Sequence, residues 1–383
     1  MNYTMNYDYE TMPFFSILVP TFNQADYLPY ALDSIIAQTM DSWEAVIVND
    51  GSTDNTNTIL KNYSSADPRF KIYNQENGGC GAALNTGLKN SRGKWICWLS
   101  SDDLFEPDKL ETHLKWINAH KNIKFFYSHF FYLNEESGDK TEPDLWRPLP
   151  PKEFQVSRFF QGNYVHGNSI AIHSDVFKKI GFFNESLRYG QDFEMWLRIS
   201  SKYPSLFINK RTCVTRWHSH QTTNDFPVAG LYDSARACHE FINTHSFEDF
   251  FPQLDLSTHS HAIEATHEIL KIAMWEGSYI YQCGYNTALL ERMREWITNY
   301  PSTQTKESVF MEIAKHTKNH SFKQIPMAIK LAFESLIHSK LPYKYRPCDF
   351  QNILKKTVKN PATDPAKREN LKRYMKNLVK NDL

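Results

Sequence analysis

Residues 94–108 combine a short apolar run with adjacent hydroxyl and carboxyl groups. The run Trp-Ile-Cys-Trp-Leu at 95–99 is typical of a buried β-strand. It ends in Ser100, Ser101, Asp102 and Asp103. Two carboxylates held at a strand end suit Mg²⁺ or Mn²⁺, because these cations prefer oxygen ligands. An acidic turn before a helix, here expected to begin at Pro107, is also common without any ligand, so this segment alone leaves both interpretations open.

The preceding part of the chain alternates predicted strands with predicted helices. Strands are expected at 14–19, 43–48, 70–73 and 95–99, and helices at 26–38, 56–62 and 82–89. This order predicts an α/β fold with a mainly parallel sheet and helices on both of its faces. Polar turns follow the strands at residues 20–23, 49–54 and 100–103. Because ligands bind at the carboxyl ends of such strands, we expect these turns to converge on one site.

The composition argues against several classes of protein, among them nucleic-acid binders, zinc proteins and membrane-spanning proteins. At 383 residues the chain can hold two or three domains, and 43 basic against 43 acidic residues give no sign of a nucleic-acid binder. The six cysteines show neither a CxxC pair nor zinc spacing, which favours free thiols in a reducing compartment. The N-terminal residues lack a basic start and an apolar core, and no long apolar run occurs. We therefore expect a cytoplasmic protein without a secretory signal or a transmembrane helix.

Four motifs occur in order across the first half of the chain. They are SILVPTFN at 16–23, VIVNDGSTD at 46–54, NGG at 77–79 with NTG at 85–87, and LSSDD at 99–103. Together they resemble the family 2 glycosyltransferases. Residues 167–169 with 177–187 are similar to the acceptor-side segment of that family, and 190–198 to its acidic helix start, where the general base lies. Residues 215–218 resemble the strand end that places a histidine near the metal, so the resemblance covers roughly residues 14–223. It implies the GT-A fold and the transfer of a sugar from a nucleotide-sugar donor with inversion at the anomeric carbon.

The resemblance also implies roles for individual residues. Asp50 would accept a hydrogen bond from the base of the donor, which we expect to be a uridine diphosphate (UDP) sugar. Asp102 would bind the cation, Mg²⁺ or Mn²⁺, that bridges to the diphosphate. His218 would lie near that metal, with His220 as a rival. The remaining donor-binding positions are Pro20, Thr21, Asn23, Ser101 and Asp103, and Asp103 would orient the metal site or the sugar.

Two positions depart from the family pattern. Ser100 stands where the first acidic residue of the Asp-x-Asp signature is usual, and Leu84 replaces the arginine of an Ala-Arg-Asn triplet. Both departures leave the identity of the donor open. Simpler interpretations also remain, because Asp50 is a suitable turn former before a glycine and His218 fits an exposed histidine at the end of a strand expected over 205–217.

Asp192 opens a predicted amphipathic helix. The resemblance makes it the general base that removes the proton of the acceptor hydroxyl. Aspartate is also a good N-cap, so a purely structural role is the alternative. If Asp192 is only a cap, Glu194 and His166 are the next candidates for the base.

Beyond residue 227 the sequence predicts helices and carries no catalytic motif. The helices are expected at 232–245, 263–281, 286–300, 306–317 and 324–338. Such an all-helical domain would pack on the catalytic domain or mediate homo-oligomers. Its last stretch is basic and has an apolar stripe of Leu371, Met375, Leu378 and Val379. This composition fits either a docked helix or peripheral association with an anionic membrane that carries lipid-linked acceptors.

We therefore predict a metal-dependent inverting glycosyltransferase that acts on a hydroxyl of a glycan or lipid-linked acceptor in the biosynthesis of bacterial surface polysaccharide or glycan. It would work in the cytoplasm or at the inner face of the membrane. The predicted organisation is an N-terminal tail (1–12), a GT-A catalytic domain (13–227, with a donor half 13–120 and an acceptor half 121–227) and a C-terminal helical domain with a basic tail (228–383). Two alternatives remain: a sugar nucleotidyltransferase, which the lack of a Gly-rich basic loop at 20–24 disfavours, and a catalytically inactive nucleotide-sugar-binding module.

Overall fold

The computed structural model describes residues 12–142, 149–218, 227–274, 278, 280, 283–306, 308 and 309. The chain divides into two compact units, one of residues up to 159 together with 163–219, and one of residues 160–162 together with those from 220 on. His220, most of the helix predicted over 306–317, the helix predicted over 324–338 and the basic C-terminal stretch lie outside the described residues.

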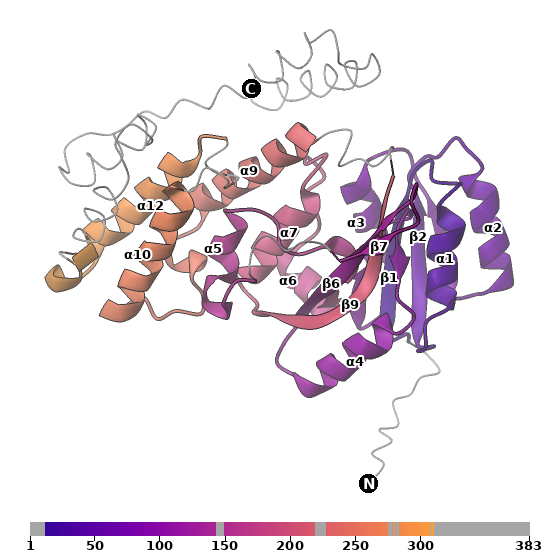
Figure 1. The fold of residues 1–383 in the computed structure, drawn as a ribbon, viewed down its shortest axis with the longest axis horizontal. Helices are drawn as coiled ribbons and strands as arrows, with labels where there is room; N and C mark the ends of the chain where they lie inside the picture. The colour runs from indigo at the N-terminus through magenta and orange to yellow at the C-terminus, as the bar shows by residue number, and fades with distance from the viewer. Residues whose placement is uncertain are drawn as a thin grey trace, which may run out of the picture. The chain divides into compact units, whose positions relative to one another are not determined.

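A nine-stranded sheet forms the centre of the first unit (Figure 1). Its strands follow the order β3-β2-β1-β4-β8-β6-β9-β5, and β7 pairs with β6. The strands are β1 (Phe15–Thr21), β2 (Trp43–Asn49), β3 (Phe70–Asn74), β4 (Trp95–Trp98), β5 (Leu104–Phe105), β6 (Phe125–Asn134), β7 (Lys140–Thr141), β8 (Ala171–His173) and β9 (Ser205–Trp217). The strand predicted over 205–217 is confirmed by β9, and the four predicted strands of the first hundred residues are present with small changes at their ends.

The sheet is parallel in its first half and mixed in its second. Strands β3, β2, β1 and β4 are mutually parallel, as predicted. The next strand, β8, runs antiparallel to both β4 and β6, because it arrives from an irregular segment and not from a crossover helix. Strands β6 and β9 are parallel to each other with a register shift near His129. The sheet is therefore less uniformly parallel than the sequence indicates.

Helices cover both faces of the parallel strands, as predicted. In this unit they are α1 (Leu28–Ile36), α2 (Thr56–Ala66), α3 (Cys80–Asn90), α4 (Lys109–Ala119), α5 (Gln155–Phe159), α6 (Ser174–Ile180) and α7 (Gln191–Ser200). Figure 1 shows α1 and α2 on one side of β1 and β2, and α3 on the other. This burial from two sides explains why every residue of β2 is buried and why its sequence does not alternate between polar and apolar residues.

Apolar side chains from the sheet and from α1 form the core of the first unit. Leu28, Leu32 and Ile35 lie on the buried face of α1 and belong to the same apolar cluster as Ile17 and Ile47. The helix predicted to begin at Pro107 begins two residues later, and Asp108 occupies its N-cap position. The core therefore holds β1, β2 and β4 rigidly, so that the turns after these strands have fixed positions.

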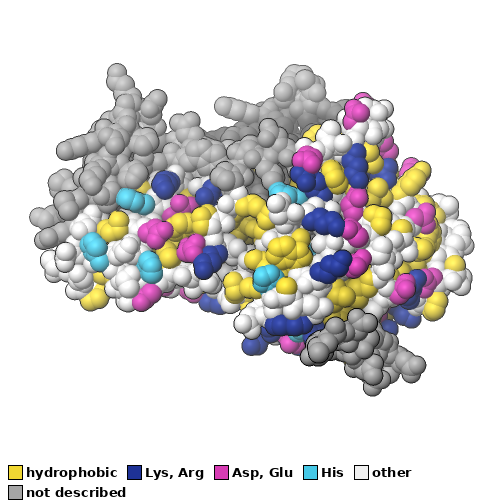
Figure 2. Space-filling view, turned by 60° about the horizontal axis from the view of Figure 1, so that its bottom comes forward, with side chains coloured by type: hydrophobic (Ala, Val, Ile, Leu, Met, Phe, Trp, Pro, Cys, Tyr) yellow, Lys and Arg dark blue, Asp and Glu magenta, His cyan; other side chains and the backbone are white. Residues whose placement is uncertain are grey.

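The described residues of the second unit are mainly helical, as predicted. The described helices are α9 (Pro227–Thr244), α10 (His259–Met274) and α12 (Asn286–Asn299). Helix α12 packs against α9 and α10, and the segment between α9 and α10 adds the buried residues Phe247, Phe250 and Phe251. Among the described residues, no helix combines the length and the apolar character that a membrane crossing requires. On the face drawn in Figure 2, basic and acidic side chains are interspersed, which agrees with the balanced composition.

Candidate functional site

Asp102 lies next to His218, although the two residues are 116 positions apart in the sequence. Asp102 follows β4, and His218 follows β9 directly. The Nε2 atom of His218 lies 3.2 Å from the Oδ2 atom of Asp102. The His218 side chain is 1% exposed and that of Asp102 is 17% exposed, so the carboxylate is the part of the pair that reaches solvent. The structure thus brings together the two residues predicted to contact a metal, and His218 is not the exposed surface histidine of the simpler interpretation.

The chemistry of this pair fits a divalent cation. A carboxylate oxygen and an imidazole nitrogen are both common metal ligands. At 3.2 Å apart, Asp102 Oδ2 and His218 Nε2 are close enough to bind the same cation. Within the described residues, no cluster of three or more His, Cys, Asp or Glu side chains is arranged to hold a metal ion. Two protein ligands leave most coordination positions for substrate oxygens and water, which is the usual situation for Mg²⁺ at phosphate-binding sites.

Three residues that the sequence analysis did not assign to the site form a contact network beside the pair of Asp102 and His218. The ring of Tyr27 stacks on the imidazole at 4.5 Å, and its hydroxyl donates a hydrogen bond to Glu135 Oε2 at 2.8 Å. The Arg216 guanidinium lies 5.3 Å from the ring of Tyr27 and donates from Nε to the backbone oxygen of Asp102. These contacts join segments far apart in the sequence, so no spacing pattern could have identified them.

Asp103 is buried and accepts hydrogen bonds from other residues of the protein. It is 4% exposed, and its two carboxylate oxygens accept hydrogen bonds from Arg216 N at 2.7 Å and from Asn168 Nδ2 at 2.5 Å. Burial and the neighbouring charge of Asp102 raise the pKa of Asp103 well above its usual range. Asp103 was predicted to contact the donor or to orient the metal site. The geometry supports the second role, because this side chain ties the turn after β4 to β9.

Asp50 holds the turn that opens helix α3. It is 3% exposed, and its carboxylate accepts hydrogen bonds from Gln75 Nε2 at 2.7 Å, Gly78 N at 2.9 Å and Gly79 N at 2.8 Å. A carboxylate has about four acceptor positions, so a further donor can still bind it. The predicted turn-forming role before Gly51 is wrong for the Asp50 carboxylate, because Asn49 Oδ1 accepts from Ser52 N in that turn while Asp50 holds residues 75–79. The predicted contact of Asp50 with a base stays a prediction.

Thr21 and Asn23 lie at the carboxyl end of β1, beside Asp50. Asn23 adopts a left-handed backbone conformation with φ of +51°, and its side-chain oxygen accepts a hydrogen bond from Thr53 N at 2.8 Å. It thereby joins the turns that follow β1 and β2. Thr21 is buried, and its hydroxyl has no hydrogen-bond partner among the described residues. Pro20, next to it, is half-buried, and Ser101 is buried in the turn after β4.

The predicted carboxylates converge on the first residue of α3. The pKa of Cys80 is raised to about 12 by burial, the largest cause, together with the negative charges of Asp192, Asp50 and Asp102. Only charges that lie close to the thiol have such an effect. Two of these carboxylates follow β2 and β4 at the sheet edge where the strand-end rule predicts a site, and the third comes from α7.

Asp192 is the second residue of α7 and is not its N-cap. Gly190 occupies the N-cap position in a left-handed conformation with φ of +71°, so the predicted capping role of Asp192 is wrong. The Asp192 carboxylate instead accepts a hydrogen bond from Asn163 Nδ2 at 3.3 Å. Burial nevertheless raises its pKa above the usual value, which makes it a better proton acceptor.

The two alternative bases are engaged elsewhere. Glu194 forms an ion pair with Arg198 within α7, with N–O distances of 2.5 and 2.9 Å. His166 contacts Thr215 Oγ1 through Nε2 at 2.9 Å and accepts a hydrogen bond from Asn168 N through Nδ1. Burial lowers the pKa of His166 to about 4, so this ring is neutral near pH 7 and has both nitrogens occupied.

Asn85 links α3 to the segment that precedes α7. Its side-chain oxygen accepts a hydrogen bond from Phe183 N at 2.8 Å, and its side-chain nitrogen donates to Phe183 O at 2.9 Å. The neighbouring Leu84, which stands in place of the family's arginine, is 1% exposed and belongs to the buried face of the helix. The donor half and the acceptor half are thus joined directly through α3, the helix that begins at Cys80.

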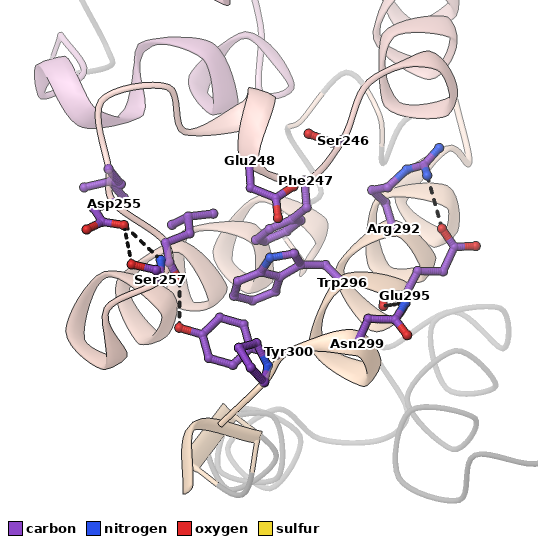
Figure 3. Close-up of a pocket in the computed structure, with 13 residues that line it drawn as sticks. Ser246, Phe247, Glu248, Asp255, Ser257, Arg292, Glu295, Trp296, Asn299 and Tyr300 are labelled. Carbon is purple, nitrogen blue, oxygen red and sulfur yellow. Dashed lines mark hydrogen bonds and ion pairs between the residues drawn. The ribbon is translucent and has the colours of Figure 1, made fainter. Parts of the chain in front are cut away.

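A separate hollow of about 720 Å³ lies in the helical unit (Figure 3). Phe247 stacks on Trp296 at 4.5 Å and Tyr300 meets Trp296 edge-on at 5.0 Å, so the floor of the hollow is aromatic. Polar side chains, including Asp255 and Asn299, form its rim. None of the residues that line it belongs to the set predicted from the sequence.

Comparison with known proteins shows that this chain is similar to glycosyltransferases. Residues 16–181 match the model of the family described as glycosyl transferase family 2. An uncharacterized glycosyltransferase of Rickettsia typhi is 38% identical over 221 residues, which cover 55% of this chain and 66% of the relative. A putative glycosyltransferase of Bacillus subtilis, EpsH, is 36% identical over 152 residues, which cover 39% of this chain and 44% of that protein. The chain thus spans less than two thirds of the length of these relatives.

Solved structures show the same fold. Residues 1–349 of Staphylococcus aureus TarS, crystallised in complex with UDP, superpose with a TM-score of 0.52 and 17% identity, covering 87% of this chain and 93% of that structure. The mixed sheet with helices on both faces is therefore the GT-A fold, as predicted.

Proposed function

We propose that this chain, whose residues 16–181 match glycosyl transferase family 2, is a metal-dependent inverting glycosyltransferase. It would transfer a sugar from a nucleotide-sugar donor to a hydroxyl group of an acceptor. The observation that carries this proposal is the convergence of Asp50, Asp102 and Asp192 on the start of α3, with His218 beside Asp102. In the proposed enzyme this arrangement would supply a base pocket, a cation site and a proton acceptor.

The donor would be a UDP sugar. Support comes from the buried, unpartnered hydroxyl of Thr21 next to Asp50, since a pyrimidine offers polar groups to both. The TarS structure of the same fold was solved with UDP. The remaining residues proposed for this pocket are Pro20, Asn23 and Ser101.

The cation would be Mg²⁺ or Mn²⁺, held by Asp102 and His218. When bound, such a cation offsets the negative charge that develops on a departing nucleoside diphosphate. Asp103 would keep Asp102 in place through its hydrogen bonds to Arg216 and Asn168.

Asp192 would be the general base. The acceptor hydroxyl would approach the anomeric carbon from the face opposite the diphosphate and pass its proton to this carboxylate. Two observations support this role: the pKa of Asp192 is raised, and its side chain is half-buried. Glu194 and His166 are less suitable, because both are engaged in contacts within the protein.

The acceptor would be a glycan or a lipid-linked glycan of the bacterial surface. The catalytic domain would comprise residues 13–227, and the helical domain that follows would place the enzyme at the inner face of the membrane through its basic end. Deleting residues from 352 onward should then reduce binding to vesicles that contain anionic lipid while transfer to a short soluble acceptor continues. Unchanged vesicle binding would contradict the membrane role.

A donor screen tests the proposal. The purified chain is incubated with Mn²⁺ and a panel of nucleotide sugars, and release of nucleoside diphosphate is measured with and without glycan acceptors. We expect turnover with a UDP sugar and none after removal of the metal. Donor binding without turnover on any acceptor would favour the inactive binding module. Formation of a nucleotide sugar from a nucleoside triphosphate and a sugar phosphate would favour the nucleotidyltransferase.

A further inference from the structure

We propose that Arg188 is a donor-binding residue and that its guanidinium contacts the diphosphate of the nucleotide sugar. The inference rests on the proposed function, since it assumes that a nucleoside diphosphate binds at the start of α3. It adds a residue from the acceptor half of the domain to a pocket whose other residues come from the donor half. The family resemblance assigned no role to this position.

The position of the Arg188 guanidinium is set by Gly79. A Cβ atom added to Gly79 would lie 2.7 Å from Arg188 Nη1, so the guanidinium rests directly on the backbone of this glycine. Gly79 has a φ of +89° and is the N-cap residue of α3, with no side chain capping the helix. The N–H groups of Gly78 and Gly79 hold Asp50, so Arg188 lies on the same turn that organises the base pocket.

The segment that carries Arg188 is fixed on α3. Asn85 bonds to both backbone groups of Phe183, five residues before Arg188. Around the first turn of α3, a Cβ atom on Gly81 would meet Asn184 O at 3.6 Å and Gln191 at 3.8 Å. Contacts on both sides of Arg188 therefore hold its backbone near the helix start.

The charges at the site require a cation of this kind. Asp50, Asp102 and Asp192 all act on Cys80, and a diphosphate would add further negative charge beside them. Arg216 is engaged with the backbone of Asp102 and with the ring of Tyr27. Position 84, where the family pattern has arginine, holds a buried leucine.

Arg188 is available for a ligand. Its side chain is exposed, and it forms no hydrogen bond or ion pair with another residue of the described part of the chain. A guanidinium offers planar N–H donors that match phosphate oxygens in pairs, so it binds phosphate with direction as well as charge. A surface arginine without function would be equally exposed, and binding measurements separate the two cases.

The test compares diphosphates with nucleosides. Dissociation constants are measured for the full-length wild type and for Arg188→Gln with UDP, GDP, CDP and dTDP in the presence of Mn²⁺, and for the matching nucleosides by ligand-observed NMR. We expect Arg188→Gln to weaken the diphosphate that binds wild type by about 10- to 100-fold, as for loss of a charged hydrogen bond, and to leave its nucleoside within twofold. Arg188→Lys should retain part of the affinity.

Lys179→Gln is the matched control. Lys179 is an exposed cation of the same half of the domain, on α6, and its removal changes the net charge equally. It should leave diphosphate affinity within twofold. If Arg188→Gln binds the diphosphate as wild type does, or weakens diphosphate and nucleoside alike, the inference about Arg188 is overturned while the proposed function stands. If wild type binds none of the four diphosphates, the proposed function fails and Arg188 fails with it.

Discussion

Asp102 and His218 are 116 residues apart in the sequence, yet Oδ2 of one lies 3.2 Å from Nε2 of the other. The contact joins the turn after β4 to the end of β9, two strands that β8 and β6 separate in the sheet. The register of the sheet places them together, and Asp103 reinforces the link by accepting a hydrogen bond from Arg216 N. The chemistry proposed for this domain depends on that link.

Asp102→Asn should abolish metal-dependent donor binding. The amide has nearly the same size as the carboxylate, so the fold should survive. It is a weaker cation ligand, so Mn²⁺ should no longer raise the affinity for UDP. Calorimetric titration of UDP with and without Mn²⁺ measures this effect. Normal metal-dependent binding by the variant would show that Asp102 is not a ligand.

Asp192→Asn should separate binding from chemistry. The change is nearly isosteric, and Gly190 remains the N-cap of α7, so the midpoint of thermal unfolding should move little. A positioned general base typically contributes about 10²–10⁴-fold, so the transfer rate should fall by that factor. UDP should still stabilise the variant against heat. Turnover close to that of wild type would exclude Asp192 as the base.

The pH dependence of transfer should reflect the raised pKa of Asp192. The base must be deprotonated to accept a proton, so kcat/KM should fall as the pH is lowered through the pKa of the free enzyme. Because burial raises that pKa, the fall should occur above the range of an ordinary aspartate, about 3.9. A profile of kcat/KM against pH checks the position of this acid limb. A limb at or below the ordinary value would contradict the assignment.

Asp103→Asn should destabilise the fold although the two side chains have the same shape. The new amide would accept from Arg216 N but would present an N–H group to Asn168 Nδ2, leaving two buried donors without an acceptor. Such a loss costs about 1–3 kcal/mol of unfolding free energy.

The double variant Asp103→Asn with Asn168→Asp provides the control. Its new carboxylate at 168 could accept from both Ser100 N and the amide at 103, so stability should be partly restored. Urea unfolding of the three variants measures the coupling. Simple addition of the two single effects would mean that the pair does not interact as described.

Tyr27→Ala should weaken metal binding without touching a ligand. The ring of Tyr27 stacks on His218, so its removal leaves the imidazole free to turn. Loss of a group that orients a ligand typically costs about 10–100-fold in metal affinity. Tyr27→Phe keeps the ring and loses only the bond to Glu135, so it should bind Mn²⁺ nearly as wild type does. Electron paramagnetic resonance of free Mn²⁺ measures both variants, and equal affinities for them would contradict the role of the ring.

The sequence predicted the framework of this site because strands and their turns are local features. Apolar runs located β1, β2 and β4, and the rule that ligands bind at strand ends correctly predicted that Asp50 and Asp102 share one edge of the sheet. The helical nature of α9, α10 and α12 followed from apolar spacing in the same way.

Long-range contacts could not be predicted. The stacking of Tyr27 on His218 and the two partners of Asp103 depend on the position of β9 in the sheet, which no local pattern encodes. The capping role of Asp192 was wrong because Gly190, in a left-handed conformation, begins the helix two residues earlier. The long-range contacts and the backbone conformation of Gly190 both depend on how the whole domain packs, which local sequence patterns do not show.

The bond between Asn85 and Phe183 sets a rule for building hybrid enzymes from this family. The match to the family model ends at residue 181, just before the partner of Asn85. A hybrid joined at that boundary would combine an asparagine side chain from one parent with a backbone segment from another, and a small shift would leave a buried amide unsatisfied. Junctions placed after Glu185, whose side chain also bonds to Asn85, would take Asn85 and both of its partners from the same parent.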